Sequence, residues 1–84
     1  MISDFKLIGL SKPNMMTCEP MDSDNIFWAP TSIPKERFDA LFEYSKGNWK
    51  DKKIAEIEHN GINKDGTPIN PMVISVREIN RPRP

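Results

Sequence analysis

Prolines and glycines divide this 84-residue chain into short segments, and this limits its fold more than any other feature. Eight prolines and four glycines leave mostly intervals of strand length, because proline ends regular structure and glycine favours turns. A chain of this length supports one modest hydrophobic core. We therefore expect a single small domain over residues 1–79, with a flexible tail at 80–84.

Five of the short segments are predicted to be strands. They are rich in apolar residues and end at proline or at turns that contain Asn, Asp and Gly. The predicted strands cover residues 5–10, 15–18, 26–29, 54–59 and 71–78. Because side chains alternate between the two faces of a strand, one of Phe27 and Trp28 should point inward and the other outward. Alternation in the last strand would place Met72, Ile74 and Val76 together on one face.

One segment, residues 34–45, has the features of a helix. Pro34 suits the first helical position, and Glu36 suits the positive end of the helix dipole. Phe38, Leu41 and Phe42 recur at the spacing of one helical face, so they should contact the core.

The order of elements is therefore strand, strand, strand, helix, strand, strand. This order predicts a mainly β protein, and it is the chain order of a small OB-fold-like five-stranded barrel with one helix between the third and fourth strands. Barrel closure would also leave few exposed strand edges. An α+β sheet with one packed helix would have the same order, and this alternative stays open.

The composition excludes several classes of protein. Cys18 is the only cysteine, so the chain can form no internal disulfide and no zinc site of several thiolates. No apolar stretch approaches the roughly 20 residues of a membrane helix, and the N-terminus does not resemble a signal peptide. Twelve basic and twelve acidic side chains balance each other. We expect a cytoplasmic protein that does not contact a membrane and has no cofactor.

Residues 46–53 are the main candidate for a binding site. Four lysines surround a tryptophan there, and lysines can neutralise phosphates while an aromatic ring can stack on a base. Trp28, Lys64 and Arg77 could extend this surface. The predicted nucleic-acid contacts are thus Trp28, Lys46, Trp49, Lys50, Lys52, Lys53, Lys64 and Arg77. Trp49 would also suit the core of so small a domain, which stays open as an alternative.

No pattern in the chain predicts catalysis. His59, the single histidine, has no nucleophile or orienting partner at a telling spacing, so we expect it at the surface of the sheet. Glu56 and Glu58 share a strand face, which favours solvated side chains over an acid–base pair. Glycine-rich phosphate loops are also absent from the sequence.

The last two predicted strands and their turn resemble the C-terminal OB domain of ATP-dependent DNA ligases. The well-matched part covers residues 53–78, and residues 26–46 match more loosely. The family ends in an R-x-D-K motif, of which this chain keeps Arg77 but not the acidic and lysine residues. Lys64-Asp65-Gly66 has some likeness to the catalytic K-x-D-G motif, but its spacing differs and it lies in a turn. A separate nucleotidyltransferase domain carries the catalytic lysine, so the resemblance does not imply ligation by this chain alone.

These features lead to two functional hypotheses of different classes. The first is a non-catalytic binding module that contacts the backbone of single-stranded or duplex DNA, as an accessory or remnant domain like that of a ligase. The alternative is a small protein-binding inhibitor or adaptor of the kind that phages encode. Neutral overall charge and five methionines suit a protein surface at least as well as a nucleic acid. A fragment of a larger enzyme would share the same sequence features.

Overall fold

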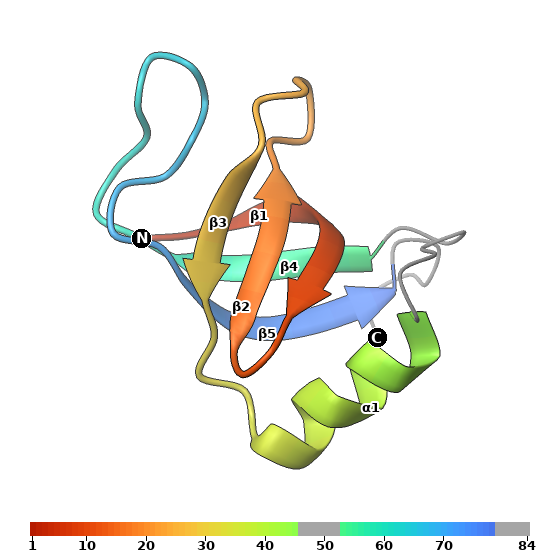
Figure 1. The fold of residues 1–84 in the computed structure, drawn as a ribbon. Coiled ribbons are helices and arrows are strands. Elements are labelled where there is room, and N and C mark those ends of the chain that lie inside the picture. The colour runs from red at the N-terminus through yellow and green to blue at the C-terminus, as the bar shows by residue number, and fades with distance from the viewer. Residues whose placement is uncertain (46–52, 79–84) are drawn as a thin grey trace.

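The structure, a computed structural model, describes residues 1–45 and 53–78 and contains the predicted order of elements (Figure 1). The mainly β chain, with one helix between the third and fourth strands, is confirmed. β2, β3, α1 and β4 begin within one residue of their predicted starts, whereas β1 begins three residues earlier. The elements are β1 (Ile2–Ser11), β2 (Met15–Glu19), β3 (Phe27–Pro30), α1 (Lys35–Ser45), β4 (Lys53–Glu58) and β5 (Met72–Glu78).

All five strands form one antiparallel sheet in the order β3-β2-β1-β4-β5. β1 is the central strand: residues 2–7 pair with β4, and residues 6–11 pair with β2. The sheet curves strongly, so that β4 and β5 run crosswise behind β2 and β3 (Figure 1). This curvature brings the two edge strands, β3 and β5, towards each other.

The sheet does not close into the expected barrel. Within residues 1–45 and 53–78, the edges are joined at one parallel bridge, between Thr31 and Val73. There the Ser32 amide and the Thr31 hydroxyl both donate to the Val73 carbonyl, at 3.0 and 2.8 Å. β3 has four residues and ends at Pro30, which has no N–H to donate, so a longer ladder towards β5 cannot form there. The arrangement fits the α+β alternative.

The core lies on the concave face of the sheet. Leu7, at the centre of β1, is fully buried, and Phe5 meets Phe27 edge to face with 5.2 Å between ring centroids. α1 lies across one end of the sheet and contributes Phe38 and Leu41 (Figure 1). No helix in the described part of the chain is long and apolar enough to span a membrane.

Two β-bulges change which side chains face the core. In β1 the register shifts between Leu7 and Gly9, and in β5 an extra residue, Ile74, lies between the partners of Ile57 and Glu56. A bulge reverses the alternation beyond it. Val73 and Val76 therefore both face inward, opposite Ile57 and Ala55, so strict alternation was wrong for the last strand. It is confirmed in β3, where Phe27 is 9 % and Trp28 64 % exposed.

We predict that Cys18 reacts with thiol reagents only when the protein unfolds. The side chain is buried, and burial raises the pKa of the thiol to about 12, so almost no reactive thiolate exists near neutral pH. Labelling with an aromatic disulfide reagent should be slow in buffer and immediate in concentrated urea. Labelling in buffer at the rate of a free thiol would contradict this placement of β2.

Candidate binding surfaces

The outer face of β3 presents Trp28. The flanking residues Phe27 and Ala29 point into the core, so the indole projects outward beside Thr17, its partner on β2. Met21 and Ile26, in the turn between β2 and β3, are each about half exposed. An exposed tryptophan is a large, rigid contact of the kind that anchors binding interfaces.

The segment that carries Trp28 has no basic side chain. Residues 13–34 contain neither Lys nor Arg but three acidic residues, of which Asp22 and Asp24 are exposed. The third, Glu19, binds Lys6 at 2.9 Å. Affinity for nucleic acid depends on cations that neutralise phosphates. This segment supplies no cation to accompany the predicted stacking of a base on Trp28.

Half of the predicted nucleic-acid contacts lie outside the described residues. This holds for Lys46, Trp49, Lys50 and Lys52. Lys53 is described and is only 4 % exposed. Its ammonium group pairs with Glu78 across β4 and β5, and it lies 4.8 Å from the centre of the Tyr44 ring. Lys53 therefore connects the sheet with α1 and is not at the exposed position expected of a phosphate contact.

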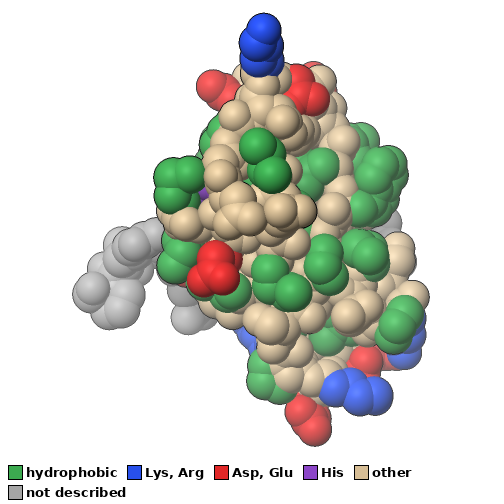
Figure 2. All heavy atoms as spheres, turned by 90° about the vertical axis from the view of Figure 1, so that its left-hand side faces the viewer, with side chains coloured by type: hydrophobic (Ala, Val, Ile, Leu, Met, Phe, Trp, Pro, Cys, Tyr) green, Lys and Arg blue, Asp and Glu red, His purple; other side chains and the backbone are tan. Residues whose placement is uncertain are grey.

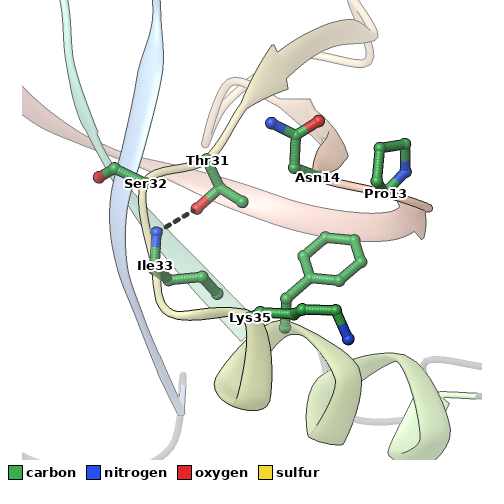
Figure 3. Close-up of a pocket in the computed structure, with 7 residues that line it drawn as sticks. Pro13, Asn14, Thr31, Ser32, Ile33 and Lys35 are labelled. Carbon is green, nitrogen blue, oxygen red and sulfur yellow. Dashed lines mark hydrogen bonds between the residues drawn. The ribbon is translucent and has the colours of Figure 1, made fainter.

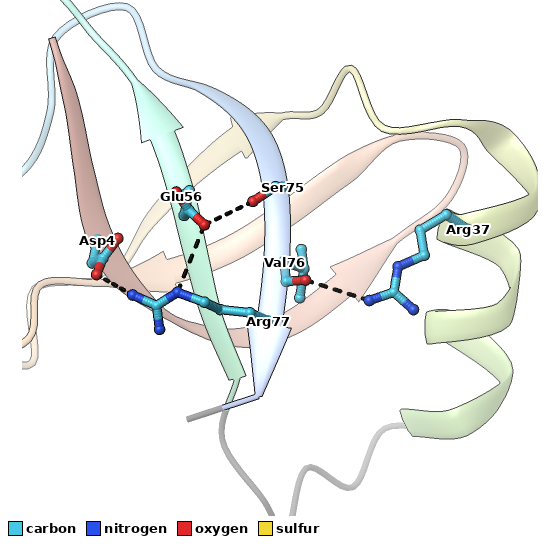
Figure 4. Close-up of polar contacts among 6 residues, drawn as sticks. All are labelled: Asp4, Arg37, Glu56, Ser75, Val76 and Arg77. Carbon is cyan, nitrogen blue, oxygen red and sulfur yellow. Dashed lines mark hydrogen bonds and ion pairs between the residues drawn. The ribbon is translucent and has the colours of Figure 1, made fainter. Parts of the chain in front are cut away.

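Arg77 belongs to an ion-pair network on the outer face of the sheet (Figure 4). Its guanidinium donates to Asp4, and its Nε lies 3.6 Å from Glu56, whose carboxylate also accepts a hydrogen bond from Ser75 at 3.0 Å. Asp4 and Glu56 are paired residues of β1 and β4, so without the guanidinium two like charges would face each other. Arg77 thus balances two carboxylates of its own sheet.

Lys64 lies exposed at the tip of the β4–β5 loop (residues 59–71), and no ion pair to it is found among the described residues. The tip itself is ordered by Asp65, whose carboxylate accepts hydrogen bonds from the Thr67 hydroxyl and amide at 2.6 and 3.0 Å. These hydrogen bonds, the hydroxyl first, lower the pKa of Asp65. The Asn25 side chain donates to the Asp65 carbonyl at 2.7 Å and joins the loop to the β2–β3 turn.

The described part of the chain is acidic overall. Residues 1–45 and 53–78 contain seven Lys and Arg against eleven Asp and Glu, a difference of −4. Lys6, Lys35, Lys53 and Arg77 are in ion pairs, and Lys12 lies over the Phe42 ring. The surface of the described fold therefore offers little free positive charge.

His59 is buried, contrary to the expected place at the sheet surface, with an exposed fraction of 3 %. The Gly61 amide donates to Nδ1 at 3.1 Å, and Nε2 lies 2.8 Å from the Ser3 hydroxyl. This pairing places the proton of the neutral ring on Nε2, which donates to Ser3. A serine nucleophile would instead have to donate to that nitrogen, so the pair does not have the arrangement of an activated serine.

A second exposed apolar surface was not predicted from the sequence. Ile2, Glu58 and Met72 are aligned across β1, β4 and β5 and point to the same outer face. Ile62 and Ile69 follow in the adjoining β4–β5 loop, and Met1 precedes the row. We call this set the N-terminal patch; its five hydrophobic members, 36–71 % exposed, are Met1, Ile2, Ile62, Ile69 and Met72.

Figure 2 shows the side of the molecule on which the β4–β5 loop and the N-terminus lie. Hydrophobic side chains are spread over much of this side, whereas Lys and Arg lie mainly at its top and along its lower margin. The signal that could have revealed the patch is the pair of isoleucines in a segment otherwise made of turn residues, Asn60 to Asn70.

A pocket of about 400 Å³ lies between the β1–β2 turn and the start of α1 (Figure 3). Its lining is apolar at Pro13, Ile33 and Phe38. The Thr31 hydroxyl at its rim is already used, because it donates to Val73 and accepts from the Ile33 amide. Lys35 is also engaged, by Asp39 at 2.7 Å. Both polar groups thus already have partners within the fold.

Among residues 1–45 and 53–78, no group of three or more His, Cys, Asp or Glu could hold a metal ion. Comparison with models of protein families, with curated proteins and with solved structures finds no match. The resemblance to the OB domain of DNA ligases therefore stays a prediction.

We predict that Arg77→Met destabilises the fold by about 1–3 kcal/mol, because Asp4 and Glu56 lose their shared counter-charge. Urea unfolding, followed by tryptophan fluorescence, should show a lower midpoint. Lys64→Met is the matched control, since Lys64 is exposed and should change stability by less than about 0.5 kcal/mol. Equal stability of the two variants would mean that the Arg77 network contributes nothing.

We also predict that the tip of the β4–β5 loop loses order in acid. The pKa of Asp65 is lowered in the folded protein, so its contribution is present above the unfolded value and is lost as the pH falls through the folded value, which lies below 3.8. The amide NMR signal of Thr67 should shift in this range. Asp65→Asn should remove the shift; a Thr67 titration that persists in this variant would assign the effect to another group.

Proposed function

We propose that this chain is a non-catalytic binding module whose partner is a protein. The observation that carries the proposal is the exposed Trp28 on β3, in a segment with apolar and acidic side chains but no basic ones. A partner protein would cover the indole together with the half-exposed Met21 and Ile26 nearby in the chain. Aromatic anchors of this kind contribute a large share of the energy at protein interfaces.

The charge distribution supports a protein partner over a nucleic acid. The described residues carry a net excess of four acidic groups, and most of their cations are paired within the fold. The chain as a whole is neutral, so it lacks the net positive charge that attracts a protein to the phosphate backbone at long range. Protein interfaces have no such requirement for positive charge, and their centres are enriched in aromatic and methionine side chains.

DNA binding is the second candidate, and it rests on residues 46–52, where the sequence places three lysines and Trp49. Lys64 is the one described residue of the predicted interface that is both basic and exposed without an ion pair among the described residues. In this hypothesis the chain contacts the phosphate backbone of DNA, and the binding weakens steeply with salt.

We predict that Trp28→Ala abolishes capture of the protein partner and leaves the fold intact, because the indole is mostly exposed and is not part of the buried core. Immobilised wild-type protein and variant would be exposed to the same extract, and the captured proteins compared by quantitative mass spectrometry. The captured amount of the partner protein should fall at least about tenfold, which is the loss expected when an aromatic anchor is removed. Tyr44→Ala, which removes a similarly exposed aromatic ring on α1, is the control, and circular dichroism verifies its fold because the ring also contacts Lys53.

Titration of labelled single-stranded, duplex and nicked DNA at two salt concentrations decides between the two candidates. No binding at low salt, with partners lost in Trp28→Ala, agrees with the proposal. Micromolar, salt-sensitive DNA binding that is lost when Lys50 and Lys52 become Ala would overturn it in favour of DNA. Capture that is identical for wild type and Trp28→Ala would remove Trp28 from the interface.

A further inference from the structure

We propose that His59 is a pH-sensitive switch built into the fold. While its ring is neutral, it holds the base of the β4–β5 loop and the N-terminus against each other, and it releases both when the ring takes up a proton. The proposal goes beyond the binding function and does not depend on the partner assigned to Trp28. It rests on the contacts of this one buried residue, through both ring nitrogens and through its backbone.

The hydrogen bonds of the ring require it to be neutral. The Gly61 amide can only donate, so Nδ1 must carry a lone pair, and the ring proton lies on Nε2, which faces the Ser3 hydroxyl. A second proton can therefore bind only at Nδ1. There it would face the Gly61 N–H, whose nitrogen is 3.1 Å away, and two donors cannot bond to each other. Protonation of the ring and its hydrogen bond from Gly61 thus exclude each other.

The surroundings of the ring do not compensate a positive charge. The side chain is buried, and the Phe5 ring lies edge to face with the imidazole, with 6.2 Å between ring centroids. Within residues 1–45 and 53–78, no carboxylate forms an ion pair with the imidazole. Because a buried charge without a counter-charge is costly, we expect the protonated ring to move towards solvent.

Of the charged groups on the neighbouring elements, the N-terminus is the one that bonds to His59. On β1, the ammonium group of Met1 donates to the His59 carbonyl at 3.0 Å, so it places a positive charge on the same residue, and Asp4 is engaged in the Arg77 network. On β4, Glu58 is exposed and points to the outer face. The charged side chains of the β4–β5 loop lie at its exposed tip; they are Lys64 and Asp65.

The hydrogen bond to His59 fixes the base of the β4–β5 loop through Gly61. The Gly61 carbonyl accepts from the Ile69 amide at 2.8 Å, and the Ile69 carbonyl accepts from the Asn60 amide at 2.9 Å. Gly61 has a φ of 140°, a conformation that glycine adopts far more readily than other residues. When its amide loses the ring nitrogen, the Gly61 peptide is free to rotate, and its hydrogen bond with Ile69 is lost with it.

The N-terminus is released by the same movement. The His59 amide donates to the Met1 carbonyl at 2.8 Å, and the Met1 ammonium group donates back to the His59 carbonyl. Displacement of the ring towards solvent moves the backbone that carries both bonds. Met1 and Ile69 belong to the N-terminal patch, so protonation of one buried ring rearranges this exposed apolar surface.

The test follows the full chain by NMR from about pH 8 to about pH 4.5, a range in which imidazoles titrate and which lies above the titration of Asp65. The ring nitrogen shifts should show Nδ1 unprotonated and Nε2 protonated at neutral pH. The amide signals of Gly61 and Ile69 should then change with the midpoint of the ring. Hydrogen-exchange protection of the His59 and Ile69 amides should fall at least about tenfold as the ring is protonated.

His59→Asn is the matched variant, because its Oδ1 can accept the hydrogen bond from Gly61 but takes up no proton. The Gly61 and Ile69 signals should be independent of pH in this variant. Ser3→Ala is the second variant: it removes the partner of Nε2 and leaves Nδ1 bonded to Gly61, so the coupled titration should persist. Circular dichroism verifies that both variants are folded.

Four results would overturn the switch, and two of them need only the wild-type protein at any one pH or along the titration. A ring that carries its proton on Nδ1 at neutral pH could not accept from Gly61. A ring that stays neutral down to about pH 4.5 would not act as a switch in the range in which imidazoles titrate. Titration of the ring without change at Gly61 and Ile69 would separate the ring from the loop. The same amide titration in His59→Asn would assign the effect to another group.

Discussion

The fold depends on β1, the one strand that pairs with both halves of the sheet. Its first residues hold β4 and its last residues hold β2, so every other strand takes its position from it directly or through one neighbour. One straight strand could not serve two neighbours that run crosswise to each other. The bulge between Leu7 and Gly9 provides the bend, and Leu7, fully buried beside it, is the side chain around which the two halves pack.

Much of this fold could be predicted from the sequence, because its signals are local. Pro20, Pro30 and Pro34 mark boundaries wherever the tertiary structure places them, and the spacing of Phe38 and Leu41 depends only on helical geometry. Both bulges escaped prediction, since an extra residue in a strand is defined by the register of the partner strand. The closed barrel was wrongly expected for the same reason. How many residues of β3 can pair with β5 depends on how the two strands face each other and cannot be read from either strand alone.

The candidate sites were less predictable, because they depend on partners far apart in the sequence. The opposite orientations of Phe27 and Trp28 were predicted, because the alternation of side chains within a short strand is a local property, but which of the two points outward was not. The burial of Lys53 depends on Glu78, and the role of Arg77 depends on Asp4, 73 residues away. His59 is accommodated inside by Ser3 and Gly61, which no spacing indicated. Two of the charged residues that the sequence assigned to a binding surface, Lys53 and Arg77, therefore form ion pairs within the fold.

The bridge between Thr31 and Val73 has a consequence for aggregation. Each edge of an open sheet presents backbone groups that can pair with another chain, and this is the usual start of fibrous assembly. Here one carbonyl, that of Val73, accepts from both the Ser32 amide and the Thr31 hydroxyl and keeps the two edges turned towards each other. A change at Thr31 that weakens this contact would let the two edges separate, and both would become more accessible to another chain. Position 31 is thus the point at which the two edges of the sheet are held together.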